Sequence, residues 1–384
     1  MPTVSAPGVS SGALAIAGHA RADSERYGHL RLLAALVCWL AGAQLATAQE
    51  EQIETPPLGG SPFRVIGFAD FDYDNTDLRG KEGFSLGQAV AHVIAPIGER
   101  LNLFSEVSLT AHDTEYSIEI ERLIIKHDFS SRNSLSAGRY HTPIGYWNTA
   151  FHHGAWLQTT ISRPESVKFG SQLIPIHFVG MLFEGQFSGE HSGLGYNVGA
   201  GNGRHANIAR AGDAGDINGK RAWVASVFYK PPSIKGLDAG IGAYSDRVSP
   251  LVGPEVDERI YSAYFALERE TPEFIAEYTH SDHELTSGAG PSGGADSFYA
   301  QFAYRLRGNM ERFKPYVRAE RIEVDAEDPL LAPLSLNYKG VTAGVRFDVR
   351  PYASLKFEYR NEEFADMGRE NSVLVQLSIV LARD

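Results

Sequence analysis

The sequence has 384 residues, with 35 basic and 47 acidic side chains, 39 glycines and one cysteine. Charged residues make up 21% and apolar residues 43%, a balance that excludes a mainly disordered chain. The net charge of −12 excludes the basic footprint of a nucleic-acid-binding protein, so we expect no nucleic-acid partner. One cysteine cannot form an internal disulfide, and we expect neither a cofactor nor a bound metal.

An apolar run lies near the start of the chain, over residues 32–42, after Arg31 and before Ala46-Thr47-Ala48. A positive flank, an apolar core and an A-x-A site are typical of a secretory signal peptide. We therefore predict a signal peptide over 1–48, cleaved after Ala48, and a short periplasmic segment over 49–62. No later segment offers the ~18 consecutive apolar residues of a transmembrane helix, whereas the strands of a membrane barrel need only about ten alternating residues.

Apolar and polar residues alternate along most of the remaining chain. Leu355, Phe357 and Tyr359, for example, alternate with Lys356 and Glu358. A period of two with aromatic and β-branched residues on one face indicates β-strands. Sixteen are predicted: 63–73, 83–95, 101–112, 116–129, 133–141, 177–187, 192–202, 220–230, 236–246, 257–268, 272–281, 296–307, 312–324, 339–349, 353–362 and 371–381.

The links between these strands differ in length in a regular way. Those after even-numbered strands are short, and most of those after odd-numbered strands are long. Tight turns on one rim and long loops on the other are typical of bacterial outer-membrane barrels. We therefore predict an all-β fold, a transmembrane antiparallel up-and-down β-barrel of about 16 strands over 63–384.

Charged side chains on these strands should face the lumen, because a charge at the bilayer midplane costs roughly 2–4 kcal/mol. Adjacent strands then place both signs on the pore wall, a mixture that favours hydrated polar solutes over apolar ones. The predicted wall residues are Glu106, Arg305, Arg318, Glu320, Arg346, Asp348, Lys356, Glu358 and Arg360.

The longest link, over 142–176, follows the fifth predicted strand. It is rich in Trp, Ile, Phe and Pro and poor in charge, so disorder is disfavoured. Its apolar side chains need burial, and the inner wall of the barrel is the shelter within reach. We predict that it folds into the lumen as a constriction, with Asn148, His152, His153, Gln158 and Arg163 facing the solute path. Adjacent histidines on an extended backbone point opposite ways, which disfavours a metal site at His152 and His153.

Two short stretches resemble a known family. Residues 138–145 (GRYHTPIG) are similar to the strand-to-loop signature of the phosphate-selective porin family and its porin-like relatives, and residues 314–321 (KPYVRAER) resemble a late strand of the same group. The resemblance implies a passive outer-membrane channel, and it allows a homotrimer. No run of lumenal arginines stands out from the carboxylates, so phosphate selectivity is not carried over.

A catalytic motif is present in form only. Residues 83–87 (GFSLG) match the G-x-S-x-G nucleophile elbow, which requires a strand–turn–helix context. The alternating pattern provides no such helix, so we predict no catalytic residue and no enzyme.

We therefore predict an outer-membrane porin of a Gram-negative-type bacterium, embedded in outer-membrane lipid, for passive diffusion of small hydrophilic solutes or ions. A channel selective for anions such as phosphate, or for short sugars, is the alternative within this architecture. A barrel enzyme of the phospholipase or protease type and a soluble secreted all-β binding protein are the alternatives of other classes.

Overall fold

The computed structural model describes residues 63–77, 82–112, 115–151, 153–189 and 193–383. The predicted signal peptide over 1–48 and the predicted periplasmic segment over 49–62 lie outside the described residues. Within the described part of the chain, no helix is long and apolar enough to cross a membrane.

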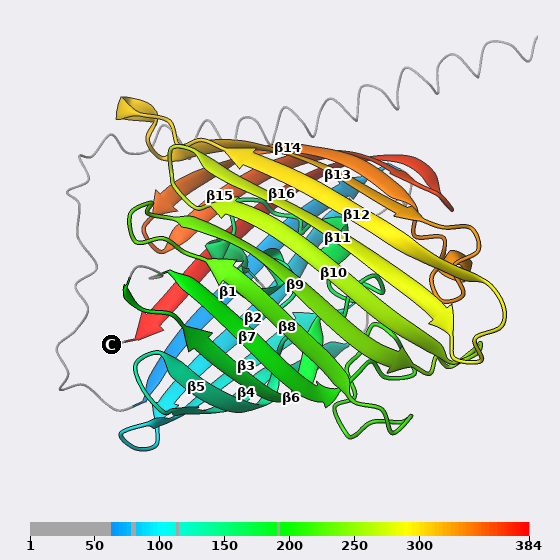
Figure 1. The fold of residues 1–384 in the computed structure, drawn as a ribbon. Coiled ribbons are helices and arrows are strands. Elements are labelled where there is room, and N and C mark those ends of the chain that lie inside the picture. The colour runs from blue at the N-terminus through cyan, green and yellow to red at the C-terminus, as the bar shows by residue number, and fades with distance from the viewer. Residues whose placement is uncertain (1–62, 78–81, 113–114, 152, 190–192, 384) are drawn as a thin grey trace, which may run out of the picture. The chain divides into compact units, whose positions relative to one another are not determined.

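Sixteen antiparallel strands form one closed barrel (Figure 1), which confirms the predicted fold class and strand number. Each strand pairs with its neighbours in the chain, and β1 closes the ring against β16, with Phe71 opposite Leu377. The strands are β1 Arg64–Thr76, β2 Glu82–Pro96, β3 Leu101–Ala111, β4 Tyr116–Asp128, β5 Asn133–His141, β6 His177–Gln186, β7 Leu194–Asn202, β8 Ala222–Tyr229, β9 Leu237–Val248, β10 Val256–Leu267, β11 Glu273–Leu285, β12 Ser292–Ala303, β13 Phe313–Val324, β14 Tyr338–Arg350, β15 Ala353–Phe364 and β16 Gly368–Arg383.

The helical elements of the described chain are short and all lie in links between strands. They are α2 Trp147–Ala150, η1 Ala155–Leu157, η2 Glu165–Val167, η4 Gly308–Met310 and η5 Ala332–Leu334. Three of them, α2, η1 and η2, belong to the link between β5 and β6, which is the segment 142–176.

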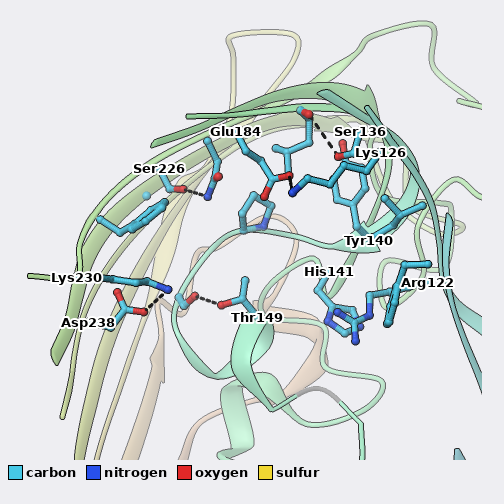
Figure 2. Close-up of a pocket in the computed structure, with 18 of the residues that line it drawn as sticks. Arg122, Lys126, Ser136, Tyr140, His141, Thr149, Glu184, Ser226, Lys230 and Asp238 are labelled. Atoms are coloured by element: carbon cyan, nitrogen blue, oxygen red, sulfur yellow. Dashed lines mark hydrogen bonds and ion pairs between the residues drawn. The ribbon is translucent and has the colours of Figure 1, made fainter. Parts of the chain in front are cut away.

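The two faces of the barrel wall differ in chemistry, as the alternation predicts. Along β13, Val317 is 45% exposed, whereas its neighbour Arg318 is fully buried. On β14, Val341 is 51% exposed and Thr342 is fully buried. The outer face is therefore apolar, and polar side chains such as Glu184 project inward (Figure 2). Such a wall is compatible with hydrocarbon on its outer face and water on its inner face.

One strand ends earlier than predicted, so a predicted wall residue lies just beyond the strand. The strand predicted over 296–307 is β12, Ser292–Ala303, so Arg305 stands in the link to β13. Main-chain hydrogen bonds nevertheless continue beyond Ala303, from Tyr304 N to Pro315 O at 3.1 Å, from Arg305 N to Glu270 O at 2.7 Å and from Leu306 N to Phe313 O at 3.0 Å. The strand prediction was wrong at this end by four residues, because alternation of side chains continues past the end of the regular strand.

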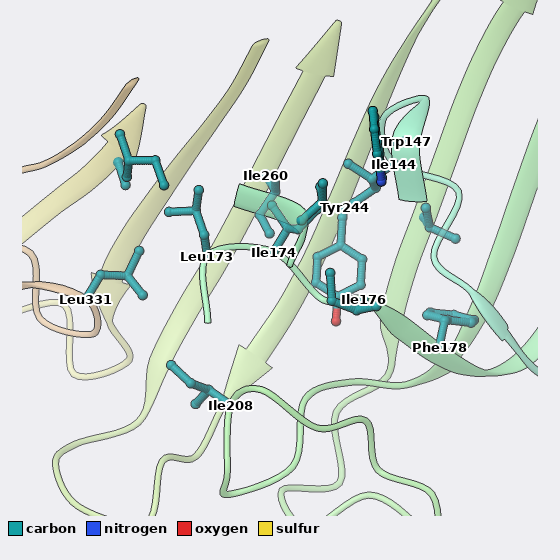
Figure 3. Packing of buried hydrophobic residues seen from close by; sticks show 14 of the residues in the cluster. Ile144, Trp147, Leu173, Ile174, Ile176, Phe178, Ile208, Tyr244, Ile260 and Leu331 are labelled. Atoms are coloured by element: carbon teal, nitrogen blue, oxygen red, sulfur yellow. The ribbon is translucent and has the colours of Figure 1, made fainter. Parts of the chain in front are cut away.

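One apolar cluster joins the segment 142–176 to residues of β5, β6 and β8 to β15. Ile144, Trp147 and Ile174 of the segment are at most 2% exposed, and they belong to one cluster with Tyr244 and Ile260 of the wall (Figure 3). Burial of this apolar surface holds the segment against the barrel wall.

Candidate functional site: the segment between β5 and β6 and the wall around it

The segment 142–176 leaves and rejoins the wall at one point. Thr142 N donates to Ile176 O at 3.0 Å, which continues the pairing of β5 with β6. The Asn148 side-chain amide donates to Thr142 O at 2.9 Å and to Ile176 O at 3.0 Å. Asn148 is fully buried and ties the two ends of the segment together. It therefore has a structural position and lines none of the cavities described below, although the sequence placed it on the solute path.

Wall carboxylates bind the main-chain N–H groups of the segment. Glu277 on β11 accepts from Tyr146 N at 2.9 Å and from Trp147 N at 2.6 Å, at the start of α2. Glu358 on β15 accepts from Ile161 N at 2.8 Å and from Ser162 N at 3.0 Å. These carboxylates supply the acceptors that irregular backbone lacks, since buried main-chain groups need partners.

Wall cations bind the carbonyl groups of the same stretch. Arg318 Nη1 donates to Ser162 O at 2.9 Å, Arg346 Nη1 to Trp156 O at 2.8 Å, and Lys356 Nζ to Thr160 O at 3.0 Å. All three side chains are less than 10% exposed. Three of the predicted wall cations are thus engaged by the segment, and charge-assisted bonds of this kind are the stronger class of hydrogen bond.

The other predicted wall residues form ion pairs on the polar face. Glu106 on β3 binds His92 at 2.9 Å and Arg122. Glu320 pairs with Arg318 at 2.7 Å, and Asp348 pairs with Arg346 at 2.7 Å. Arg360 pairs with Glu362, and Arg305 pairs with both Glu270 and Asp348. These wall residues therefore place both signs of charge close together, and each of them has a partner of opposite charge.

A histidine joins the segment to strands on another side of the ring. His153 Nδ1 lies 3.1 Å from Gln88 Oε1 on β2, and its Nε2 lies 3.3 Å from Glu121 Oε1 on β4. The His153 ring stacks on the Phe169 ring, with 4.7 Å between the ring centres. The Arg163 guanidinium lies 4.2 Å from the centre of the Phe169 ring. Polar contacts of the segment thus reach β2 and β4 as well as β11, β13, β14 and β15.

A cavity of about 310 Å³ lies between the segment and strands β1, β2 and β16. Three of the predicted constriction residues line it, while His152 lies outside the described residues. The side chains that give the cavity its polar character are His153, Gln158 and Arg163 from the segment and Asp70, Asp72, Gln88 and Gln376 from the wall. The carboxylates and the guanidinium give the cavity both signs of charge.

Asp70 and Asp72 were missed by the sequence reasoning, although a signal for them is present. Both alternate with Phe71, which is 44% exposed on the outer face, so the rule that charges face the lumen applies to β1 as well. Gly87 provides the space for them, because a Cβ there would lie 1.6 Å from Asp70 Oδ2 and 2.7 Å from Asp72 Oδ2.

The structure also bears on the catalytic motif and on the metal site considered from the sequence. Ser85 of the G-x-S-x-G match lies within β2 and not at a strand–turn–helix junction. Among the described residues, no group of three or more histidine, cysteine, aspartate or glutamate side chains is arranged to hold a metal ion.

Comparison with known proteins gives the fold. No protein-family model and no curated protein sequence matches the chain. Among solved structures, the anion-selective porin of Comamonas acidovorans superposes with a TM-score of 0.61 at 10% identity, covering 83% of this chain and 99% of that chain. The outer membrane channel DcaP of Acinetobacter baumannii gives 0.61 at 9% identity, covering 83% and 97%. OmpT, an outer membrane protein of Vibrio cholerae, in its trimer form gives 0.54 at 11% identity, covering 83% and 99%.

These likenesses show a porin-like barrel fold. They do not single out the phosphate-selective family that residues 138–145 and 314–321 resemble. The sequence identities are too low to carry more than the fold.

Proposed function

We propose that this protein is an outer-membrane porin through which small hydrophilic solutes or ions diffuse passively. The observation that carries the proposal is the closed ring of sixteen strands whose outer face is apolar and whose inner face is polar and charged. A closed barrel leaves no unpaired strand edge, and an apolar exterior is the surface that lipid requires. The porin-like fold of the outer-membrane proteins to which the chain is similar supports the same location.

In this proposal the segment 142–176 folds into the lumen and narrows it. Its contacts support this role, because its main chain is bound by side chains of β11, β14 and β15. The side chain of His153 lies 3.1 Å from that of Gln88 on β2, at another part of the ring. A solute then passes the cavity between the segment and β1, β2 and β16, where His153, Gln158 and Arg163 face Asp70 and Asp72. The trimer form of one similar barrel supports a homotrimer for this chain.

A channel for anions such as phosphate is the second candidate. The resemblance of residues 138–145 to phosphate-selective porins favours it, as does the likeness to a barrel described as an anion-selective porin. Asp70 and Asp72 in the narrow cavity oppose it, because a carboxylate pair repels phosphate. We therefore place the general channel first.

The decisive experiment is conductance of the purified, refolded protein in a planar lipid bilayer. Stepwise, voltage-independent current increments in KCl are expected, with ion permeabilities that differ little between K⁺ and Cl⁻. A heat-dependent shift in SDS gels and recovery with the outer-membrane fraction would accompany them. A folded barrel that gives no current, or a protein recovered without membrane, would refute the proposal in favour of an enzyme or a soluble binding protein.

A further inference from the structure

A second cavity, near the short links, is separate from the cavity of about 310 Å³ described above. It has a volume of about 500 Å³ and lies between the inner faces of β2 to β10 and the first residues of the segment, including Pro143 and Thr149 (Figure 2). This volume falls within the range of small-molecule sites, roughly 300–1,000 Å³. The two cavities share no lining residue.

The charges that line this cavity are paired with one another or with a neighbour. Lys126 Nζ lies 2.9 Å from Glu184 Oε2, and Lys230 Nζ lies 2.9 Å from Asp238 Oδ2. Arg122 donates to the buried carboxylate of Glu106. An ionic solute would therefore find no unpaired counter-charge among these groups. The paired side chains still offer N–H groups and oxygen lone pairs to a neutral solute.

Two hydroxyl groups that line the cavity are buried without a partner. Tyr140 is 3% exposed and Ser262 is 6% exposed, and within the described part of the chain neither Tyr140 OH nor Ser262 Oγ has a hydrogen-bond partner. Buried hydroxyls in folded proteins are nearly always bonded, because leaving one unsatisfied costs about 1–3 kcal/mol. These two groups, on β5 and β10, therefore point to a hydroxyl-bearing occupant of the cavity.

The space in front of Ser262 is kept open by a glycine. A Cβ on Gly242 would lie 2.9 Å from Ser262 Oγ and 3.6 Å from the carbonyl of Pro143. Any side chain at this position would therefore close the gap between β10 and the segment. Gly242 itself lines the cavity, beside Ser262.

Neutral donors, acceptors and aromatic rings complete the lining. Asn197 Nδ2 donates to Ser226 Oγ at 3.0 Å, and both groups keep further hydrogen-bonding capacity. Tyr264 also lines the cavity, and its hydroxyl donates to Asp238 at 2.9 Å. A lining that mixes polar groups with aromatic rings suits a solute that carries hydroxyl groups on one side and C–H groups on the other.

We propose that this cavity binds a neutral polyhydroxylated solute of the size of a monosaccharide or small disaccharide as it crosses the barrel. The inference rests on the proposed channel function and names the substrate class of that channel. Transient binding at such a site makes flux saturable, since a solute must enter and leave the same polar cavity.

The test is block of ion current by sugar in planar bilayers, with glucose and sucrose as probes and gluconate and glycine betaine as charged and zwitterionic controls. A saturable decrease in KCl current is expected with glucose or sucrose and not with the controls. In Ser262→Ala and Tyr140→Phe, the half-blocking concentration should rise about five-fold, as loss of one neutral hydrogen bond predicts. Ser297→Ala removes a hydroxyl on β12 that lies outside this cavity, and it should leave the block unchanged.

Each outcome of this test supports or overturns the proposed sugar-binding cavity. Absence of sugar block in a conducting protein, or equal block by gluconate or betaine, overturns the proposal. Sugar block that Ser262→Ala and Tyr140→Phe leave unchanged also overturns it, since the site then lies elsewhere. If the folded barrel does not conduct, the channel function fails, and calorimetric titration of the detergent-folded protein with glucose still decides whether the cavity binds sugar.

Discussion

The main-chain N–H of Trp147 donates to the buried carboxylate of Glu277 at 2.6 Å, across 130 residues of sequence. The same carboxylate accepts from Tyr146 N and from the Tyr299 hydroxyl. One wall side chain thus caps α2 and fixes where the segment 142–176 begins its course.

The first prediction concerns this carboxylate. Glu277→Gln removes the charge and presents an N–H₂ group to N–H donors, so we expect unfolding of the barrel to become easier by about 2 kcal/mol, the value of a hydrogen bond to a charged group. Urea unfolding in lipid vesicles, followed by tryptophan fluorescence, measures it. Glu323→Gln on the exposed end of β13 is the matched control, with no change expected. Equal stability of both variants would show that the carboxylate does not anchor α2.

The second prediction concerns the width of the channel. Replacing residues 151–162 by two glycines removes the part of the segment that the wall cations bind, and those cations then become hydrated in the lumen. Single-channel conductance should rise at least two-fold in a barrel that still migrates as folded. The control is the same replacement in the exposed link 286–291. Unchanged conductance after removal of 151–162 would place the segment outside the ion path.

The third prediction concerns ion selectivity. Asp72→Asn removes a negative charge from the cavity of about 310 Å³, and Arg163→Gln removes a positive one. A single charge within a few ångströms of a hydrated ion changes its energy enough for about a three-fold change in permeability ratio. Reversal potentials in a KCl gradient should therefore move toward anions in the first variant and toward cations in the second. Asp282→Asn, on an exposed position of β11, should move neither.

The fourth prediction concerns the outer face. Val341 is 51% exposed on β14, and Val341→Arg would place a charge in hydrocarbon at a cost of roughly 2–4 kcal/mol. Membrane assembly of this variant should fall sharply, as measured by the folded fraction on unheated SDS gels. Val341→Ala and Arg346→Ala should both assemble, because neither introduces a charge into lipid. Normal assembly of Val341→Arg would show that this face is not in the bilayer.

The fifth prediction concerns pH and the link after β13. Asp328 accepts from His283 Nδ1 at 2.7 Å and from the N–H groups of Leu330 and Leu331. Burial alone would raise the pKa of Asp328, but these hydrogen bonds and the charge of His283 outweigh it and hold the pKa below its ordinary value. A lowered folded-state pKa stabilises the protein above the unfolded-state pKa of about 3.9. This stability is lost as the pH falls through the lower folded-state pKa.

Asp328→Asn should therefore destabilise the folded protein by about 2 kcal/mol at pH 7. The gap to the unmodified protein should close as the pH falls below the ordinary carboxyl range. Unfolding in urea at a series of pH values measures it, with Asp366→Asn in the exposed link 365–367 as the control. A gap that stays constant down to acid pH would show that the charge of Asp328 contributes nothing.

Local sequence determined most of the wall. Alternation sets which side chain faces lipid, because successive residues of a strand point to opposite sides, and the cost of charge in lipid fixes which side is outward. Every predicted strand is present, with ends within four residues of the observed ones. The contrast between short and long links followed from the same alternation, because it marked where each strand stopped.

Tertiary structure decided how the segment 142–176 uses its residues. Composition predicted that the apolar side chains of this segment need burial. The structure shows that the Asn148 side chain donates to the main-chain carbonyl of Thr142, whereas His153, Gln158 and Arg163 line a cavity with Asp70 and Asp72. Pairings such as Trp147 with Glu277 join groups more than a hundred residues apart, and they depend on the closure of the ring. Irregular backbone has no period that assigns its side chains to a face, so its partners follow from the three-dimensional arrangement of wall charges and not from the order of residues.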